Sequence, residues 1–368
     1  MENVVKMMRK KTKLTGFVVL SDKHVVLKYV DESEHCIEFC DTMEYFFERK
    51  DFIERSNIFD KETTCFCFWE MKKWMGPNIS DNSCSKVLDR LTQISPFRSL
   101  DLEVDASNLT ESFGTTLMTL TSELKRFSSI DLKGNIDLKH LNVIMDSADK
   151  RSEFGVLDFE FPLNFHHDKA FHFYTIYYGD ARWVRTRHLC SLRNSRNVTL
   201  RNLMLTPKDI NCFIKYWINS EYDMFKSMRL LEYSTDVDIR TVLKDVVALE
   251  TFLFERKFYL ISAKYPTSRK YSVLGIGFGY DTLSLLALTP REAYSRHPAE
   301  PPLKEYKVLR YLNEKTELEK ELEKVEGDQD GMEERVQNLV KKYQDLVEEF
   351  KFSSIQPTLD LSLVFKIV

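Results

Sequence analysis

Histidines gather around residue 166 in a pattern that suggests acid–base or metal chemistry. His166, His167 and Asp168 are consecutive, and His172 follows shortly after them. Imidazole binds metal ions, and its ordinary pKa of about 6.5 suits proton transfer near neutral pH. However, His167 and His172 lack the spacing of about four residues that aligns two ligands on a helix, and no nucleophile motif accompanies them. We interpret these histidines as surface or partly buried residues.

The glycine run Gly275-Ile276-Gly277-Phe278-Gly279 suggests a phosphate-binding loop at first sight. The dinucleotide fingerprint G-x-G-x-x-G must lie between a strand and a helix. Here the third glycine comes one place early and a strand-like segment follows, so we expect strand glycines that allow close backbone approach or a bulge. The sequence also has no G-x-S-x-G nucleophile motif and no protein-kinase signature set. We therefore predict no catalytic residue and no bound cofactor, in a protein that is not an enzyme.

The cysteines give no metal-binding pattern. There are 7 of them, and no two form a C-x-x-C pair. A zinc site would have to combine His35, Cys36, Cys40, Cys65 and Cys67, which lack the usual ligand spacing. We predict no metal ligand and expect buried free thiols in a reducing compartment.

The composition is that of an ordinary globular protein. A chain of 368 residues with 43% hydrophobic and 30% charged residues predicts two or three domains. The formal net charge of −4 and the isoelectric point near 6.1 give no basic footprint for nucleic acid. No apolar run reaches the roughly 18 residues of a membrane span, and the chain does not begin with a signal-type segment. We expect an intracellular protein, cytoplasmic, nuclear or both, that binds neither nucleic acid nor membranes.

A weak repeat organises the middle of the chain. Segments of alternating apolar and polar residues, which are typical of strands, lie at residues 99–102, 129–132, 156–159, 198–200 and 228–230. Apolar stripes at helical spacing lie at residues 113–127, 138–145 and 239–247. Repeated strand–helix units predict parallel strands joined by right-handed crossovers. The expected fold class is α/β with leucine-rich-repeat-like units, and an ordinary doubly wound sheet is the alternative.

Composition and pattern together predict four regions along the chain. They are a small β-rich part at 1–94, the repeat-like α/β domain at 95–290, a charged helical segment at 303–351 and a C-terminal tail at 352–368. Further strands are expected at 17–19, 25–29, 37–39, 258–261, 272–278 and 282–288. Prolines after residue 289 mark the boundary that separates the α/β domain from the charged segment.

The charged segment carries a heptad pattern of apolar residues. From Leu318 to Phe350 these residues follow alternating steps of four and three, as in a coiled coil. Gly327 and Gly331 interrupt the pattern at a cost of about 1 kcal/mol each inside a helix, and Asp330 resembles a helix N-cap. One coiled coil and a hairpin of two short helices both fit the segment, and either would allow self-association.

The best-defined local element is a helix from Thr206 to Ile218. Thr206 is a favourable N-cap, Pro207 suits the first turn, and Asp209 places negative charge at the positive end of the helix. The apolar residues that share one face are Ile210, Phe213, Ile214, Trp217 and Ile218. The sequence predicts a capped helix whose apolar face packs on the preceding strand.

The same segment resembles a known family. Residues 194–200, the pair Leu205-Thr206 and the run Asp209-Ile210-Asn211-Cys212-Phe213-Ile214-Lys215-Tyr216-Trp217 are similar to the type 2 F-box-associated domain of nematode F-box proteins. The resemblance extends more loosely to residues 228–233, 242–245 and 271–288. Its signature positions, which we interpret as structural, are Asn194, Ser195, Leu200, Thr206, Asp209, Ile210, Asn211, Phe213, Lys215 and Trp217.

The resemblance implies a protein–protein interaction module that selects substrates for an SCF-type ubiquitin ligase, in which an amino-terminal F-box grips a Skp-type adaptor. Only residues 4–10 resemble the tail of an F-box, so we expect adaptor binding only if an F-box exists upstream. Asn219-Ser220-Glu221 replaces the family's glycine-rich turn. The target is unknown. The alternative is a stand-alone scaffold or oligomerising protein that assembles through 303–351.

Overall fold

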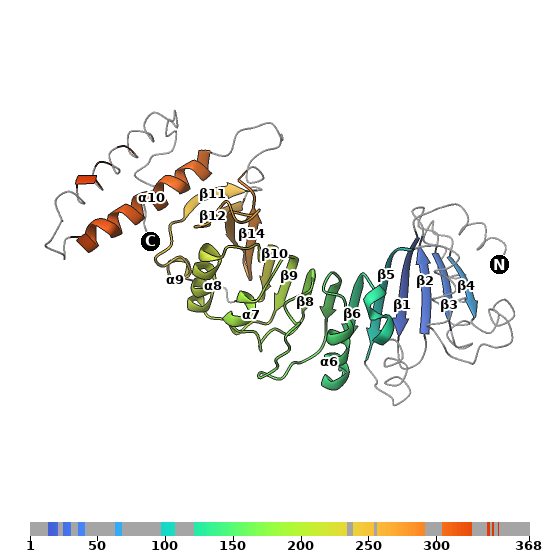
Figure 1. The fold of residues 1–368 in the computed structure, drawn as a ribbon. Coiled ribbons are helices and arrows are strands. Elements are labelled where there is room, and N and C mark those ends of the chain that lie inside the picture. Colours follow the sequence, from blue (N-terminus) through green and yellow to red (C-terminus); the bar gives the residue numbers. More distant parts are fainter. Residues whose placement is uncertain are drawn as a thin grey trace. The chain divides into compact units, whose positions relative to one another are not determined.

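The computed structural model of the chain divides into two compact units, Met1–Trp183 and Val184–Val368 (Figure 1). The structure describes residues 14–20, 25–30, 36–40, 63–67, 97–106, 121–233, 238–253, 256–290, 304–325, 337–338, 341 and 345. Within these ranges, no helix is both long enough and apolar enough to cross a membrane.

The first unit is built on a mixed sheet. Its strands are β1 (Leu14–Leu20), β2 (Val25–Val30), β3 (Cys36–Cys40), β4 (Thr63–Cys67), β5 (Phe97–Asp105), β6 (Ser129–Lys133), β7 (Glu153–Val156) and β8 (Thr175–Tyr178). They follow the order β8-β7-β6-β5-β1-β2-β3-β4. β5 to β8 are parallel, as are β1 with β5 and β3 with β4, whereas β1, β2 and β3 are antiparallel neighbours.

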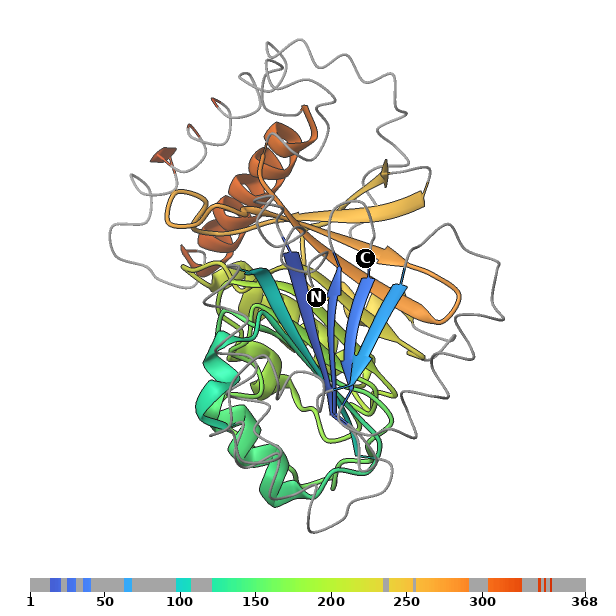
Figure 2. The same ribbon diagram turned by 90° about the vertical axis from the view of Figure 1, so that its right-hand side faces the viewer.

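Alternating side chains fix which face of the β5–β8 part is buried. Buried apolar residues alternate with polar ones: they include Leu100, Leu102, Val104, Ile130 and Leu132. The helix α6 (Leu138–Ser147) and the 3-10 helix η1 (Thr121–Arg126) lie to one side of these strands (Figure 2). α6 buries Leu141, Ile144 and Met145. The opposite face of β5–β8 therefore carries the polar residues.

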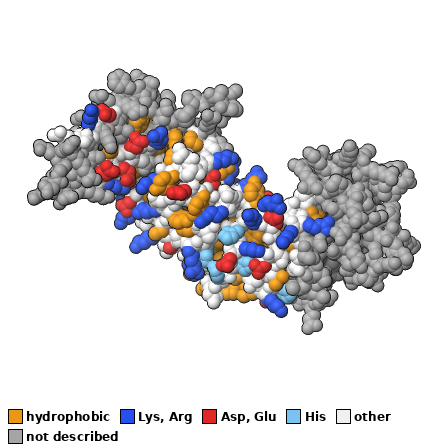
Figure 3. Space-filling view, viewed as in Figure 1, with side chains coloured by type: hydrophobic (Ala, Val, Ile, Leu, Met, Phe, Trp, Pro, Cys, Tyr) orange, Lys and Arg blue, Asp and Glu red, His pale blue; other side chains and the backbone are white. Residues whose placement is uncertain are grey.

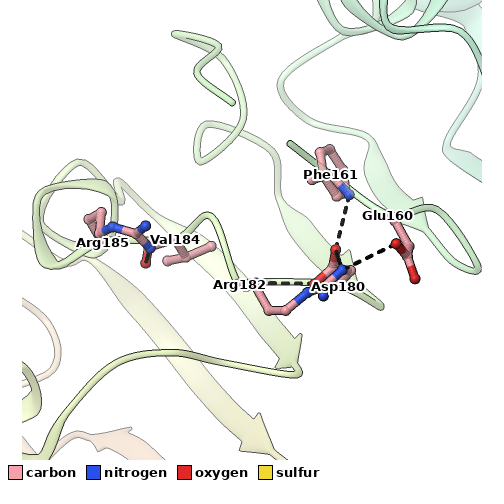
Figure 4. A network of polar contacts seen from close by, with 6 residues as sticks. All are labelled: Glu160, Phe161, Asp180, Arg182, Val184 and Arg185. Atoms are coloured by element: carbon pink, nitrogen blue, oxygen red, sulfur yellow. Dashed lines mark hydrogen bonds and ion pairs between the residues drawn. The ribbon is translucent and has the colours of Figure 1, made fainter. Parts of the chain in front are cut away.

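An aromatic cluster packs the segment that leads from β7 to β8. The rings of Phe161 and Phe165 lie 5.3 Å and 4.9 Å from that of Trp183. Beside this cluster, Asp180 accepts a 3.0 Å hydrogen bond from the Phe161 backbone and one of 2.7 Å from Nε of Arg182 (Figure 4). These contacts order a segment that has neither helix nor strand between residues 157 and 174.

The second unit is also a mixed sheet, with helices added. Its strands are β9 (Ser195–Arg201), β10 (Phe225–Leu231), β11 (Leu249–Leu253), β12 (Arg256–Ser262), β13 (Val273–Phe278) and β14 (Thr282–Leu288), in the order β9-β10-β14-β13-β12-β11. Only β9 and β10 are parallel, and the remaining neighbours are antiparallel. The helices are α7 (Thr186–Cys190), α8 (Pro207–Asn219), α9 (Ile239–Val242) and α10 (Lys304–Val325).

Two helices, α8 and α10, pack on this second sheet. α8 buries all of its apolar stripe except Ile218, which is partly exposed. Phe213 stacks on Phe225 of β10 with ring centroids 6.1 Å apart. α10 lies beside β12 (Figures 1 and 2). Its Leu309 is completely buried in a cluster with Phe258 and Leu260. Phe258 and Leu260 alternate with Tyr259 and Ile261 along β12, so α10 covers the sheet face that carries Phe258 and Leu260.

The expectation of a leucine-rich-repeat-like fold is wrong. A repeat of that kind needs parallel strands with one helical unit after each, but β10, β14, β13, β12 and β11 are antiparallel neighbours. The helical units also fail to recur: residues 157–174 contain none, α7 has 5 residues and α9 has 4. The fold is mixed α/β with few helices, and it is largely antiparallel in its C-terminal half.

Several local predictions were nevertheless correct. α6, α8, β12 and the hairpin of β13 and β14 form where the patterns placed them, as do β1, β2 and β3. The predicted strand at 156–159 is displaced, since β7 ends at Val156. β4, β8 and β11 were not predicted. The predicted stripe at 113–127 ends in η1, and residues 107–120 lie outside the described residues.

The charged C-terminal segment is described only in part. α10 ends at Val325, and Gly327 and Gly331 lie outside the described residues. The choice between one coiled coil and a helical hairpin therefore remains open, and the four predicted regions remain predictions. What is new is that the beginning of this segment packs on β12 through Leu309.

Candidate recognition surface

The beginning of α8 is held by a reciprocal cap. The Thr206 hydroxyl accepts a hydrogen bond of 3.2 Å from the Asp209 backbone, and Asp209 accepts one of 2.8 Å from the Thr206 backbone. The hydroxyl of Thr186, on α7, donates to the same carboxylate at 3.3 Å. The side-chain hydrogen bond from Thr206 lowers the pKa of Asp209. Thr206 and Asp209 therefore fix both the start of α8 and its position beside α7.

Two further polar residues of α8 tie it to the segment around α9. Asn211 is buried, and its Nδ2 donates hydrogen bonds of 2.9 Å to the carbonyls of Val242 and Lys244. Nζ of Lys215 lies 3.1 Å from the carboxylate of Asp245. A buried side-chain amide that bonds two carbonyls stabilises that one arrangement, because an unpaired carbonyl would be costly.

Trp217 packs against Arg269, a residue that the sequence analysis did not identify. The Arg269 guanidinium lies 3.8 Å above the Trp217 ring. It donates hydrogen bonds to the carbonyls of Trp217 at 2.8 Å, Ser220 at 3.2 Å and Tyr271 at 2.6 Å. Burial lowers the pKa of Arg269 to about 10. The turn Asn219-Ser220-Glu221 is therefore held from outside, which explains how it closes without the family's glycines.

The remaining signature residues are also structural. Ser195, Leu200, Ile210 and Phe213 are all buried. Asn194 has a φ of 54°, a left-handed backbone that Asn tolerates better than most residues. The ten predicted signature positions lie on β9 and α8 or directly beside them, and most of their side chains pack or bond within this framework.

Other side chains of this region lie on the sheet face that carries Phe258 and Leu260, where residues pair in rows that run across up to five strands. One row runs Thr199, Arg229, Ser284, Gly277 and Phe258. A second row is Asn197, Ser227, Leu286, Gly275 and Leu260, and a third is Arg201, Leu231 and Thr282. Directly paired residues point to the same side of a sheet. We call the part of these rows on β9, β10 and β14 the open face.

α10 covers only one end of the open face's rows. Phe258 and Leu260 are buried beneath Leu309, and Leu286 is partly buried against the same cluster. At the other end, Asn197, Arg201 and Arg229 are exposed, while Thr199, Ser227 and Ser284 are partly exposed. The open face therefore presents mainly polar side chains at one end, and it meets the apolar side chains beneath α10 at the other end.

The comparisons with known proteins coincide with this region. Residues 163–230 match the sequence model of the F-box associated family. The chain contains an F-box associated domain. The matched residues of the domain include β8, α7, β9, α8 and β10, so both strands that carry Arg201 and Arg229 belong to it. The predicted family resemblance is confirmed.

The F-box associated domain also has a distant relative of known sequence. The Skn-1 dependent zygotic transcript 15 protein of Caenorhabditis elegans is 26% identical over 161 residues, which are 42% of this chain and 44% of that protein. The aligned part thus spans less than half the length of this relative. F-box associated domains are binding modules rather than catalytic ones and serve substrate recognition in F-box proteins generally.

The three histidines singled out by the sequence, His166, His167 and His172, are exposed or partly exposed. His166 and Asp168 pair at 3.1 Å, and their side chains are 60% and 92% exposed. His167 is more buried, lies 3.5 Å from Asp146, and has its pKa lowered by burial. Figure 3 shows histidine side chains at the surface beside acidic groups. The described residues contain no group of three or more His, Cys, Asp or Glu arranged to hold a metal ion.

The glycine run is structural as well. A Cβ at Gly277 would lie 2.7 Å from the ring of Phe258, so the absence of a side chain makes room for that ring. This confirms the expectation of close approach within a strand. Cys190 and Cys212 are free thiols, but Cys212 is exposed, so the expectation that the thiols are buried is wrong for that residue. The other cysteines lie outside the residues whose side chains are described.

Proposed function

We propose that this chain selects a target protein for an SCF-type ubiquitin ligase, and that the open face contacts the target. The observation that carries the proposal is a difference between two sets of side chains within residues 163–230. Nine of the ten signature side chains, all but that of the exposed Asn194, are buried or bonded within the framework, whereas Asn197, Arg201 and Arg229 are exposed on the open face. Exposed side chains on a rigid sheet are what a partner can contact.

The proposal places the protein inside the cell, in the cytoplasm or the nucleus, where ubiquitin ligases act. It leaves the link to the ligase to a Skp-type adaptor, provided that the full-length protein carries an F-box. The alternative is a stand-alone scaffold that binds its partner without promoting degradation, with 303–351 as the assembling segment. The packing of Leu309 on the sheet favours a structural role for the start of that segment.

Proximity labelling in cells of the organism that makes this chain would test the proposal. The full chain is fused to a biotinylating enzyme, and labelled neighbours are followed for ubiquitination and half-life before and after depletion of the chain. We expect at least one neighbour that loses ubiquitin and accumulates on depletion. Neighbours whose ubiquitination and half-life do not change would contradict a ligase role and support the scaffold.

Two arginine variants of the same fusion test the assignment to the open face. Arg229→Glu should abolish labelling of the target, whereas Arg240→Glu, at an exposed position on α9, should leave it unchanged. Loss of labelling in both variants, or in neither, would contradict the open face as the contact surface.

A further inference from the structure

Arg229 stands alone at the centre of the open face. Thr199 and Ser284 are its direct neighbours in the row, and both offer a hydroxyl. The side chain of Arg229 is exposed and forms no hydrogen bond or ion pair with any described residue. A guanidinium flanked by hydroxyls presents several donors in one plane, which suits a carboxylate.

The charges around Arg229 have one predominant sign. The strands β9 (SRNVTLR) and β10 (FKSMRLL) contain Arg196, Arg201, Lys226 and Arg229 and no acidic residue. All four of these basic residues are exposed. The acid that does lie here, Glu232, directly follows β10 and is bonded to Nε of Arg201 at 2.6 Å. Only Arg201 and Arg229 of these four lie on the open face, since Arg196 and Lys226 alternate with them along the strands. The rows of the open face contain no acidic residue, so Arg229 faces no carboxylate across the strands.

The open face also has an apolar side. Leu286 and Leu288 are partly buried, and they pack together with Tyr306 and Val308 of α10 against the cluster around Leu309. A segment lying on the open face would therefore contact hydrogen-bond donors of side chains on β9 and β10, and apolar side chains on β14. Neighbouring strands lie about 4.8 Å apart, so three strands span roughly 10 Å, which leaves room for an extended segment.

We propose that the open face binds an extended segment of the target that carries an Asp or Glu beside apolar residues, with the carboxylate on Arg229. This inference rests on the proposed function, since it states the chemistry of the target. The carboxylate pairs with the guanidinium and accepts hydrogen bonds from the neighbouring hydroxyls, while the apolar residues lie against Leu286 and the start of α10.

An array of synthetic peptides, probed with the fluorescently labelled full chain, tests this directly. The peptides form three matched sets with a central Glu, Gln or Lys among leucines and valines. We expect the Glu set to bind about tenfold more tightly than the Gln set, the change that a lost charged hydrogen bond produces, and the Lys set to bind least. The preference should weaken with added salt.

Variants of the chain assign the preference to one residue. Arg229→Glu should remove binding of the Glu set and improve binding of the Lys set, while Arg229→Lys should keep a reduced preference for Glu. Arg240→Glu is the matched control and should behave as the original chain. Thermal unfolding of each variant checks that Arg229→Glu is folded, and Arg229→Gln replaces it if it is not.

Equal binding of the Glu and Gln sets would overturn the inference, as would no binding above background or a preference that survives Arg229→Glu. Such a result is distinct from failure of the proposed function, because the array does not involve ubiquitin. If labelled neighbours are still ubiquitinated in cells while the array shows no preference for Glu, the target is recognised through other chemistry.

Discussion

Carboxylates and arginines occupy equivalent places on the open sheet faces of the two units. In the first unit, Glu103 pairs directly with Asp131, and Asp101 and Glu153 both pair with Ser129. In the second unit, the same alternation exposes Arg229 between Thr199 and Ser284. The buried faces are alike, with apolar residues at every second position. Alternation thus makes a polar face in each unit, but the sign of its charge depends on individual residues.

The two faces also differ in how much electrostatic repulsion destabilises the folded state. Like charges placed directly opposite across strands are destabilising, and Lys133, 2.7 Å from Glu103, offsets part of the repulsion in the acidic row. Burial, together with Glu153 and Asp131, raises the pKa of Asp101 to about 6. On the second face Arg229 is exposed and remains hydrated at little cost. The acidic face is therefore destabilised by repulsion between its own carboxylates, whereas Arg229 faces the uncharged Thr199 and Ser284 across the strands.

Each face contains a glycine that makes room for a neighbour, and the largest predicted effect is at Gly277. A Cβ there would lie 2.7 Å from the ring of Phe258, which is buried with Leu260 and Leu309 and has no space to move. Gly277→Ala should lower the free energy of unfolding by about 2 kcal/mol, as overpacking does. Urea unfolding measures this change. Gly279→Ala is the control, because its Cβ would meet only ordinary contacts of 3.4 Å or more. Equal losses in both variants would contradict the argument.

The corresponding glycine of the acidic face should be more tolerant. A Cβ at Gly155 would lie 2.2 Å from Oδ1 of Asp131, but a partly exposed carboxylate can rotate towards water. Gly155→Ala should therefore cost about 1 kcal/mol in urea unfolding. The cost should disappear when Asp131→Ala is combined with it, because the two residues are in contact. An unchanged cost in the double variant would mean that the backbone, and not Asp131, limits the site.

The sequence predicts most of what is local in this fold. The cap of Thr206 and Asp209, the apolar stripe of α8 and the hairpin of β13 and β14 all follow from short-range patterns. β8 and β11 escaped prediction because they follow irregular or very short connections and show no clear alternation. The repeat-like arc was wrong for a different reason. The antiparallel pairing of β10 with β14 joins residues far apart in the chain, which no local pattern reveals.

The candidate site was less predictable than the framework. The family signature identified α8, and its residues turned out to be bonded within the domain. Arg229 lies inside a predicted strand, but its importance depends on the rows that pair it with Thr199 and Ser284. Arg269 gave no signal at all, because its partners Trp217 and Ser220 lie far from it in sequence. In both cases the missing information is the pairing of distant segments.

The pH dependence of stability should separate the two faces next. In the folded chain the pKa of Asp101 is about 6 against an ordinary 3.8, so the folded state binds the proton more tightly than the unfolded state does. That contribution is fully present below pH 3.8 and is lost as the pH rises through about 6. Asp101→Asn should therefore stabilise the chain at pH 8 by about 1 kcal/mol, after allowance for partial exposure, and give no gain at pH 4. Asp158→Asn, in an exposed loop of the same unit, is the control. A gain at pH 4 as large as that at pH 8 would refute the electrostatic explanation.

The smallest effects come from supplying each face with the charge it lacks. Ser129 lies between Asp101 and Glu153, so Ser129→Lys places a cation between two carboxylates. Ser284 lies opposite Arg229, so Ser284→Glu offers that arginine a single partner. Cross-strand pairs of opposite charge contribute about 0.2–1 kcal/mol. We expect the upper end of that range for Ser129→Lys, because it relieves repulsion, and the lower end for Ser284→Glu. Thermal unfolding at low and high salt measures both, and the gains in stability should shrink with salt.

Ser284→Glu should in addition compete with acidic peptides for Arg229, so a variant that is slightly more stable should bind these peptides less. If it binds them as well as the original chain does, Arg229 is not the residue that holds the carboxylate.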